Sequence, residues 1–193
     1  MAIFRRALLS VALATPALAA SDDTARTERA IGSPQAKQTA IECFSLTCPH
    51  CAAFALESLP ELKTRWIMPG RLHWVFYDFP TDIAALQAAM VARYLPPERY
   101  ERFVNTLFAN QDRWVFGAGS VADALWPLAG DAGMDRTTFD RALADNGLQD
   151  WIVGRARDAQ ERWHVEATPS FVINGKLYTG AMSASDFAVI LRG

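Results

Sequence analysis

Apolar residues along this chain follow two different spacings, and the change between them divides the sequence. They are almost continuous over residues 39–46, as expected for a central strand that is covered on both faces. They return in residues 71–79 with strand-like spacing, and Pro80 ends that run. Between these strands, residues 51–66 have helical spacing with a bend expected at Pro60. The three elements predict one right-handed β-α-β unit.

Helical spacing then dominates a long stretch of the chain. From residue 82 to about residue 164 the apolar positions recur with a period near 3.6 rather than 2. The period predicts five helices, near residues 83–91, 100–108, 121–132, 139–144 and 148–163. We therefore expect an all-helical insertion between two groups of strands.

Strand character returns after the insertion. Two β-rich runs, residues 171–173 and 177–179, flank an Asn-Gly pair and predict a hairpin. A last helix is predicted over residues 183–191, with a serine as its cap. Near the start of the chain, residues 29–34 predict a short edge strand closed by a turn. The fold class is therefore α/β, with the order β-α-β, helical insertion, β-β-α.

The first 20 residues have the pattern of a secretory signal peptide. Arg5 and Arg6 precede an apolar core over residues 7–14, which is too short to span a bilayer. The Ala-Leu-Ala at residues 17–19 supplies a small-x-small cleavage pattern. A short buried helix is the less favoured alternative. The polar residues 21–29 are expected to be a flexible lead-in.

Length and charge limit the number of domains and the kinds of partner that the protein can have. A chain of 193 residues suits one domain, or one domain with an insertion. The 19 basic and 21 acidic residues give a formal charge of −2, which becomes −4 without Arg5 and Arg6. Nothing in this balance indicates a nucleic-acid or anionic-membrane surface. We expect an exported, soluble protein, and in an oxidising compartment a pair of cysteines can persist as a disulfide.

The candidate chemistry lies in Cys48-Pro49-His50-Cys51, where the first strand meets a helix. The unpaired N–H groups and the dipole of a first helical turn stabilise an anion. The pKa of Cys48 should therefore fall below the value of about 8.5 for a free thiol. Cys51, one turn further on, should be shielded by the helix. We expect Cys48 to be the attackable sulfur and Cys51 the resolving one.

The two intervening residues set the direction of the redox chemistry. Pro49 suits the first helical position, where an N–H group would have no partner. The imidazole of His50 is expected to stabilise the Cys48 thiolate further. A stabilised thiolate favours the dithiol form and makes the disulfide a stronger oxidant.

These residues resemble the DsbA group of thioredoxin-like proteins. The matching segments are residues 42–54, 59–62, 76–80 and 167–175, which together cover essentially the whole mature chain. The resemblance implies a thioredoxin fold with an inserted helical domain. It divides the chain into a signal peptide (1–20), a first thioredoxin-like part (21–80), the helical insertion (81–164) and a second thioredoxin-like part (165–193).

The resemblance also implies a second half of the site. In such proteins a cis-proline faces the cysteine pair, and Thr168-Pro169 occupies that place here. The backbone of Thr168 would then pair with an incoming peptide as an extra strand. An ordinary trans proline that opens a strand is the alternative. Many relatives carry a second disulfide, whose matching positions here are Tyr94 and Ala142, so that bridge is absent.

Three side-chain roles stay open at this point. By resemblance, Glu42 lies beneath the disulfide and exchanges protons with Cys51; alternatively it is a strand-end carboxylate in solvent. Cys43 is expected to be a small packed side chain. A zinc site built from Cys43, Cys48, Cys51 and a histidine is disfavoured, because no second cysteine pair stands at ligand spacing. We expect no metal and no cofactor.

The resemblance implies a periplasmic thiol:disulfide oxidoreductase that oxidises reduced exported proteins. A DsbB-type membrane oxidase would restore its disulfide. The alternatives are a disulfide isomerase or reductase of the same fold, and a holdase or metal-binding protein. Known isomerases of this type carry an N-terminal oligomerisation segment, for which few residues are available here, so we expect a monomer.

Overall fold

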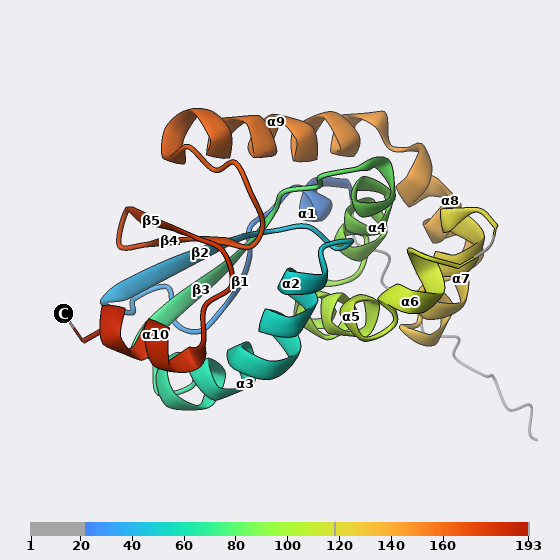
Figure 1. The fold of residues 1–193 in the computed structure, drawn as a ribbon. Helices are drawn as coiled ribbons and strands as arrows, with labels where there is room; N and C mark the ends of the chain where they lie inside the picture. Colours follow the sequence, from blue (N-terminus) through green and yellow to red (C-terminus); the bar gives the residue numbers. More distant parts are fainter. Residues whose placement is uncertain (1–21, 118, 193) are drawn as a thin grey trace, which may run out of the picture.

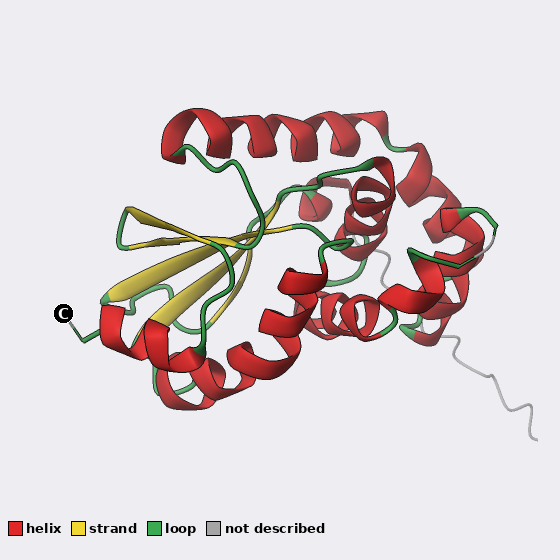
Figure 2. Cartoon of the chain, viewed as in Figure 1, coloured by secondary structure: helices red, strands yellow, loops and turns green. Residues whose placement is uncertain are grey.

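The protein is built on one five-stranded mixed sheet with helices on both faces (Figures 1 and 2). The computed structural model describes residues 22–117 and 119–192, so the predicted signal peptide lies outside the described residues. The strands are β1 (Arg29–Ile31), β2 (Gln38–Phe44), β3 (Leu72–Asp78), β4 (Ser170–Ile173) and β5 (Lys176–Thr179). Their order across the sheet is β1-β3-β2-β4-β5.

The predicted strands and their pairing are confirmed. Strand β2 is parallel to β3 and antiparallel to β4, so it is the central strand that its continuous apolar run indicated. Strands β4 and β5 form the predicted hairpin. Its turn residues, Asn174 and Gly175, both have positive φ, which explains why the sequence places Asn-Gly there. Strand β1 is the antiparallel edge strand beside β3.

The helices follow the predicted order with two additions. They are α1 (Asp22–Ala25), α2 (Pro49–Ala53), α3 (Leu59–Leu62), α4 (Ile83–Arg93), α5 (Pro97–Ala109), α6 (Gln111–Trp114), α7 (Val121–Asp131), α8 (Arg136–Ala144), α9 (Asn146–Trp163) and α10 (Ala184–Ile190). Helices α1 and α6 were not predicted, because four residues are too few to show a helical period. Within the described residues, no helix is both long enough and apolar enough to cross a membrane.

The helix that follows the cysteine pair is widened rather than simply bent at Pro60. Two π-helical segments, Phe54–Ser58 and Lys63–Ile67, lie on either side of α3. Proline has no N–H and its ring crowds the preceding turn, so the ladder before Pro60 shifts to longer-range bonds such as Leu59 N–H to the carbonyl of Phe54.

Each face of the sheet has its own covering layer. Helix α9 covers one face, where Tyr77 and Trp163 meet with ring centroids 5.5 Å apart. Helices α2, α3 and α10 cover the other face, and this core continues into the helical segment through Phe44 and Phe108. Helix α9 packs on the sheet with one half and on the helical segment with the other. The boundaries at residues 81 and 164 therefore remain a prediction.

The two positions matching the second disulfide of relatives are filled by packing. Tyr94, the residue that ends α4, and Ala142, on α8, are both buried, and the two helices lie against each other. The Tyr94 hydroxyl donates to Asp145 Oδ2 at 2.9 Å. Asp145 also caps α9 by accepting from the N–H of Leu148 at 2.8 Å. Burial and hydrogen bonds thus hold together the two elements that a disulfide would have linked.

The N-terminal segment that was expected to be flexible is instead held against the body of the protein. Arg26 forms an ion pair with Asp145 at 2.8 Å. Ala25 and Arg29 are buried, and the Arg29 guanidinium donates to the Arg93 carbonyl at 2.9 Å. Composition predicted a loose lead-in because it cannot reveal contacts that span more than 60 residues.

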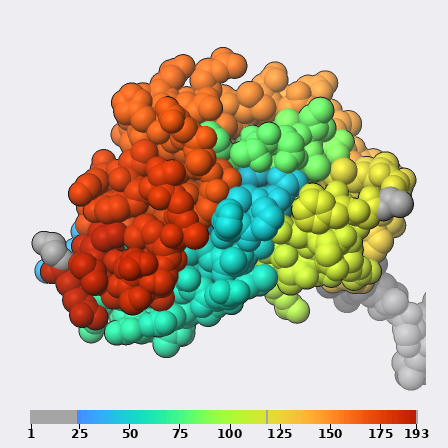
Figure 3. Space-filling model, in the orientation of Figure 1, coloured from blue at the N-terminus to red at the C-terminus, as the bar shows by residue number. Residues whose placement is uncertain are grey.

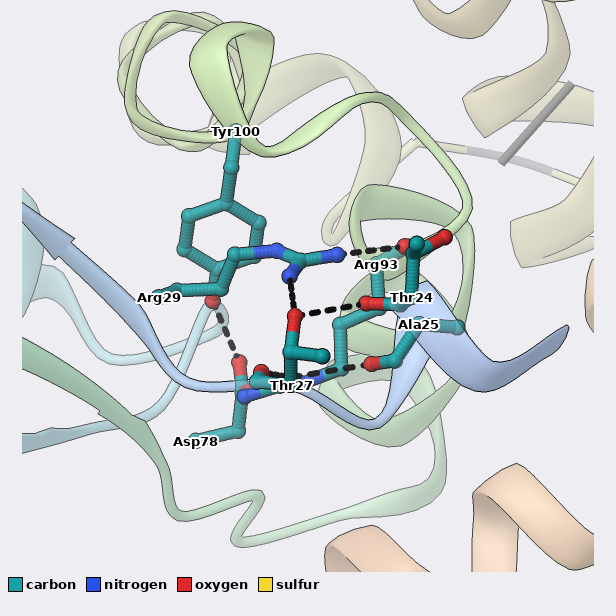
Figure 4. A network of polar contacts seen from close by, with 7 residues as sticks. All are labelled: Thr24, Ala25, Thr27, Arg29, Asp78, Arg93 and Tyr100. Atoms are coloured by element: carbon teal, nitrogen blue, oxygen red, sulfur yellow. Dashed lines mark hydrogen bonds and ion pairs between the residues drawn. The ribbon is translucent and has the colours of Figure 1, made fainter. Parts of the chain in front are cut away.

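Arg93 is the centre of the polar network that fixes this segment (Figure 4). Its fully buried guanidinium pairs with Asp78 and donates to the carbonyls of Ala25 and Thr27, both at 3.0 Å. The Tyr100 hydroxyl donates to the other oxygen of Asp78 at 2.8 Å. Because a buried charge is stable only when it is paired and hydrogen-bonded, these contacts act as one unit.

We expect Arg93→Met to lower the free energy of unfolding by about 3–5 kcal/mol, because it leaves Asp78 buried without its charge partner. Urea unfolding monitored by circular dichroism measures this loss. The matched control is Arg136→Met, which removes the exposed ion pair with Asp140 and should change stability by at most about 1 kcal/mol. Equal losses in the two variants would contradict the proposed importance of the network.

Candidate active site

The cysteine pair sits where the sequence predicted, at the junction of β2 and α2. Cys48 is the N-cap of α2 and has an extended backbone conformation, with Pro49 in the first helical turn. The helix begins with a bond from the Ala52 N–H to the Cys48 carbonyl, at 3.1 Å. An N-cap side chain normally accepts from the N–H groups two and three residues on. The Cys48 sulfur makes no such capping hydrogen bond, although the nearby N–H groups of His50 and Cys51 still lower its pKa.

This placement lowers the pKa of Cys48 to about 5. The largest cause is the hydrogen bond from the Cys51 thiol, and the side chain of Thr168 and the backbone N–H groups of Cys51 and His50 act in the same direction. Partial burial of the sulfur opposes the shift. His50 thus acts through its backbone N–H, and its side chain is exposed. The expected contribution of its imidazole stays a prediction.

The second cysteine has the opposite environment. Cys51 is fully buried, whereas Cys48 is only partly buried. Burial raises the pKa of Cys51 strongly, and the hydrogen bond to Cys48 raises it further. The two thiols therefore differ in both accessibility and acidity. Figure 3 shows that the start of α2 reaches the surface between the C-terminal segment and the helical segment.

The Thr168-Pro169 peptide bond is cis, as expected, and it faces the cysteine pair. The sulfur of Cys48 lies 3.3 Å from the carbonyl oxygen of Thr168, so the thiol form can donate to this carbonyl. Pro169 is buried immediately before β4, and its carbonyl accepts from the N–H of Gly180 at 2.9 Å.

Glu42 is buried, so the prediction of a strand-end carboxylate in solvent is wrong. Its side chain is on the face of β2 that packs against α2, and only 1% of the residue is exposed. The indole N–H of Trp74 donates to Oε2 at 3.2 Å, while Oε1 has no partner among the described residues. Burial raises the pKa of Glu42 to about 8, against the opposing effect of Trp74. An ionised Glu42 would raise the pKa of Cys51 further.

The third cysteine belongs to the other face of the sheet. Side chains alternate along a strand, so Cys43 points away from Glu42 and toward α9. It is fully buried beside Tyr77 and Val165, and burial raises its pKa to about 12. It is therefore the packed side chain that was predicted. Among the described residues, no three metal-ligating side chains cluster together, so the zinc alternative gains no support.

Two sets of contacts around the site were not anticipated from the sequence. The side-chain amide of Gln111, on α6, donates to the carbonyls of Leu46 and Cys48. A chain of hydroxyl groups also links the loop before Cys48 to the start of α4, through Ser45, Thr47, Thr81 and Asp82. Both sets join residues more than 30 positions apart, and no local pattern in the sequence signals them.

Comparison with known proteins shows which family this chain belongs to. A family model described as thioredoxin matches residues 24–192. A protein of Rickettsia felis, provisionally named as a protein-disulfide oxidoreductase, is 25% identical over 146 residues, which are 75% of this chain and 52% of that protein. This chain therefore spans about half the length of the first curated relatives that it matches.

Solved structures match over most of the chain. The crystal structure of alpha-DsbA1 from Wolbachia pipientis is 26% identical with a TM-score of 0.79, covering 86% of this chain and 89% of that one. A protein-disulfide isomerase from Novosphingobium aromaticivorans is 26% identical with a TM-score of 0.72, covering 86% and 98%. The thioredoxin-like fold with a helical insertion is thus confirmed.

We expect the reduced protein to show one thiolate that titrates with a midpoint near 5, because Cys48 alone has a lowered pKa. Ultraviolet thiolate absorbance as a function of pH measures it. Cys48→Ser should abolish this transition, and Cys51→Ala should move it to higher pH by removing the main hydrogen bond to the sulfur. A midpoint near that of a free thiol, about 8.5, would refute the geometry described for Cys48.

We expect Glu42→Gln to stabilise the reduced protein increasingly as the pH rises. Since the pKa of Glu42 is about 8 when folded and near 4.5 when unfolded, the folded state disfavours the charged form. The wild-type protein therefore begins to lose stability above the pKa of Glu42 in the unfolded state, and the loss is complete above its pKa in the folded state. Urea unfolding from pH 4 to 9 should therefore show a difference that grows between about 4.5 and 8 and is flat beyond. A difference independent of pH would contradict the raised pKa.

Proposed function

We propose that this chain, which belongs to the thioredoxin family and is DsbA-like in sequence and fold, is an exported dithiol oxidase. In this proposal it donates its Cys48–Cys51 disulfide to reduced secreted proteins during oxidative folding. The observation that carries the proposal is the difference between its two thiols. One is partly exposed with a pKa of about 5, and the other is buried with a raised pKa.

This difference sets both the direction and the order of the reaction. A thiolate that is stable at neutral pH stabilises the dithiol form, so the disulfide is a strong oxidant. The Cys48 thiolate is also a good leaving group, because a thiol of low pKa departs more readily. The exposed sulfur is the one that a substrate can reach, so the mixed disulfide forms on Cys48.

The reaction then proceeds in two exchanges. A substrate thiolate attacks the sulfur of Cys48, the bond between Cys48 and Cys51 breaks, and Cys51 departs with the electron pair. The second substrate thiolate attacks the substrate sulfur bound to Cys48, and Cys48 departs as a stable thiolate. The substrate loses two electrons and gains a disulfide, while the cysteine pair gains two electrons and becomes a dithiol.

The departing Cys51 needs a proton, because its raised pKa disfavours the thiolate. Glu42 has a pKa of about 8, so at neutral pH it is mostly protonated and can supply one. Its burial on the face of β2 toward α2 supports this role over that of a surface carboxylate.

The proposal extends to compartment and partners. The signal-peptide pattern of residues 1–20 supports export to the periplasm, where a disulfide persists. The cis Thr168-Pro169 bond beside Cys48 supports binding of an extended substrate segment. Reduced exported proteins would be the substrates, a DsbB-type membrane oxidase the re-oxidant, and the protein would act as a monomer.

An isomerase is the second candidate, because one structural neighbour at 26% identity bears that name. An isomerase and an oxidase share the cysteine pair but differ in redox potential and in oligomeric state. The low pKa of Cys48 favours the oxidase. A holdase or metal-binding role has no comparable support.

We expect the Cys48–Cys51 pair to have a reduction potential above about −180 mV in equilibrium with glutathione. The wild-type protein should oxidise a reduced, unfolded protein containing several cysteines faster than it rearranges a scrambled one. Cys51→Ser should accumulate mixed disulfides through Cys48, and Cys48→Ser should not. A potential near that of thioredoxin, about −270 mV, would refute the oxidase. Faster rearrangement together with a stable dimer would support the isomerase.

A further inference from the structure

Gln111 is a buried polar side chain whose bonds end on the redox loop. Its amide nitrogen is 2.7 Å from the carbonyl oxygen of Leu46 and 3.2 Å from that of Cys48. Carbonyl oxygens only accept hydrogen bonds, so the amide group must face them with its nitrogen. The side chain therefore donates both of its N–H bonds to the loop between β2 and α2.

These two carbonyls control the shape of that loop. They flank Thr47, immediately before the helix begins. The Cys48 carbonyl also accepts the bond from the Ala52 N–H that starts α2. A donor that fixes both carbonyls thus fixes the start of α2 and the place of Cys48 as its N-cap.

Gln111 is itself held rigidly by the helical segment. It belongs to the short helix α6, which packs against α5 and α7. On the same helix, Trp114 is buried, and its indole N–H donates to the Leu107 carbonyl of α5 at 2.8 Å. The amide of Gln111 is therefore a fixed hydrogen-bond donor, which the helical segment provides to the loop between β2 and α2.

We propose that Gln111 is a positioning residue of the redox site, through which the helical segment holds the Cys48 loop in the conformation that places the sulfur at the N-terminus of α2. This inference rests on the proposed function in that Cys48 is taken as the reactive thiol. It assigns to the helical segment a part in setting the chemistry of the cysteine pair.

The titratable groups around this sulfur are few. Cys51 and His50 lie on the same helix, Glu42 acts on Cys51 from β2, and Asp82 reaches the loop through a bond from the Thr47 hydroxyl at 2.6 Å. Gln111 has no titratable proton, so a change at this position alters the titration of Cys48 only through geometry and hydrogen bonding.

The test compares two glutamine variants with the wild-type protein. Gln111→Met keeps the length of the side chain but removes the donors, and Gln149→Met makes the same change at an exposed position of α9. We expect Gln111→Met to raise the pKa of Cys48 by about one unit, which at neutral pH makes the disulfide about tenfold less oxidising against glutathione. Gln149→Met should match the wild-type protein.

The outcomes separate this inference from the proposed function. If wild-type Cys48 titrates like a free thiol, the proposed function fails. If the wild-type pKa is low and Gln111→Met leaves it unchanged while both redox forms lose stability equally, Gln111 is only structural and the inference is overturned.

A measurement on the wild-type protein covers the case in which Gln111→Met does not fold. In nuclear magnetic resonance spectra of the reduced protein, the side-chain amide signals of Gln111 should shift with the same midpoint as Cys48. Those of Gln149 should not. Amide signals of Gln111 that stay constant through this transition would overturn the inference.

Discussion

The structure depends on the convergence of hydrogen-bond donors on one sulfur. Cys48 occupies an N-cap, the place where a helix offers unpaired N–H groups, and the Cys51 thiol adds a donor from the next turn. The rest of the fold serves this arrangement. Cys48 follows the carboxyl end of the central strand β2, and the cis-proline loop faces it. The helix that follows buries Cys51.

The two faces of β2 place neighbouring side chains in different environments. Glu42 and Cys43 are neighbours in the chain, yet the alternation of a strand sends them into different layers. Glu42 lies on the side of α2, with a raised pKa and with one oxygen that has no partner among residues 22–117 and 119–192. Cys43 lies under α9 among apolar side chains. The third thiol therefore lies in a different layer of the fold from Cys48 and Cys51.

The helical segment is joined to the sheet by polar contacts as well as by its core. The buried Arg93 and Asp78 tie α4 to the end of β3 and to the N-terminal residues. Gln111 ties α6 to the loop that carries Cys48. Since buried polar groups tolerate few alternative arrangements, these contacts fix how the inserted helices sit relative to the redox site.

The sequence alone determined most of the elements and the position of the cysteine pair, because both depend on neighbours in the chain, whereas the four-residue helices α1 and α6 gave no signal. Strand and helix periods, the Asn-Gly turn, and a cysteine placed before Pro49 are local features. Only the tertiary structure decided the burial of Glu42 and the contacts of Arg93 and Gln111. Each of these depends on burial or on partners far away in the chain. A pattern of residue types does not specify which distant groups meet, whereas a packed fold does.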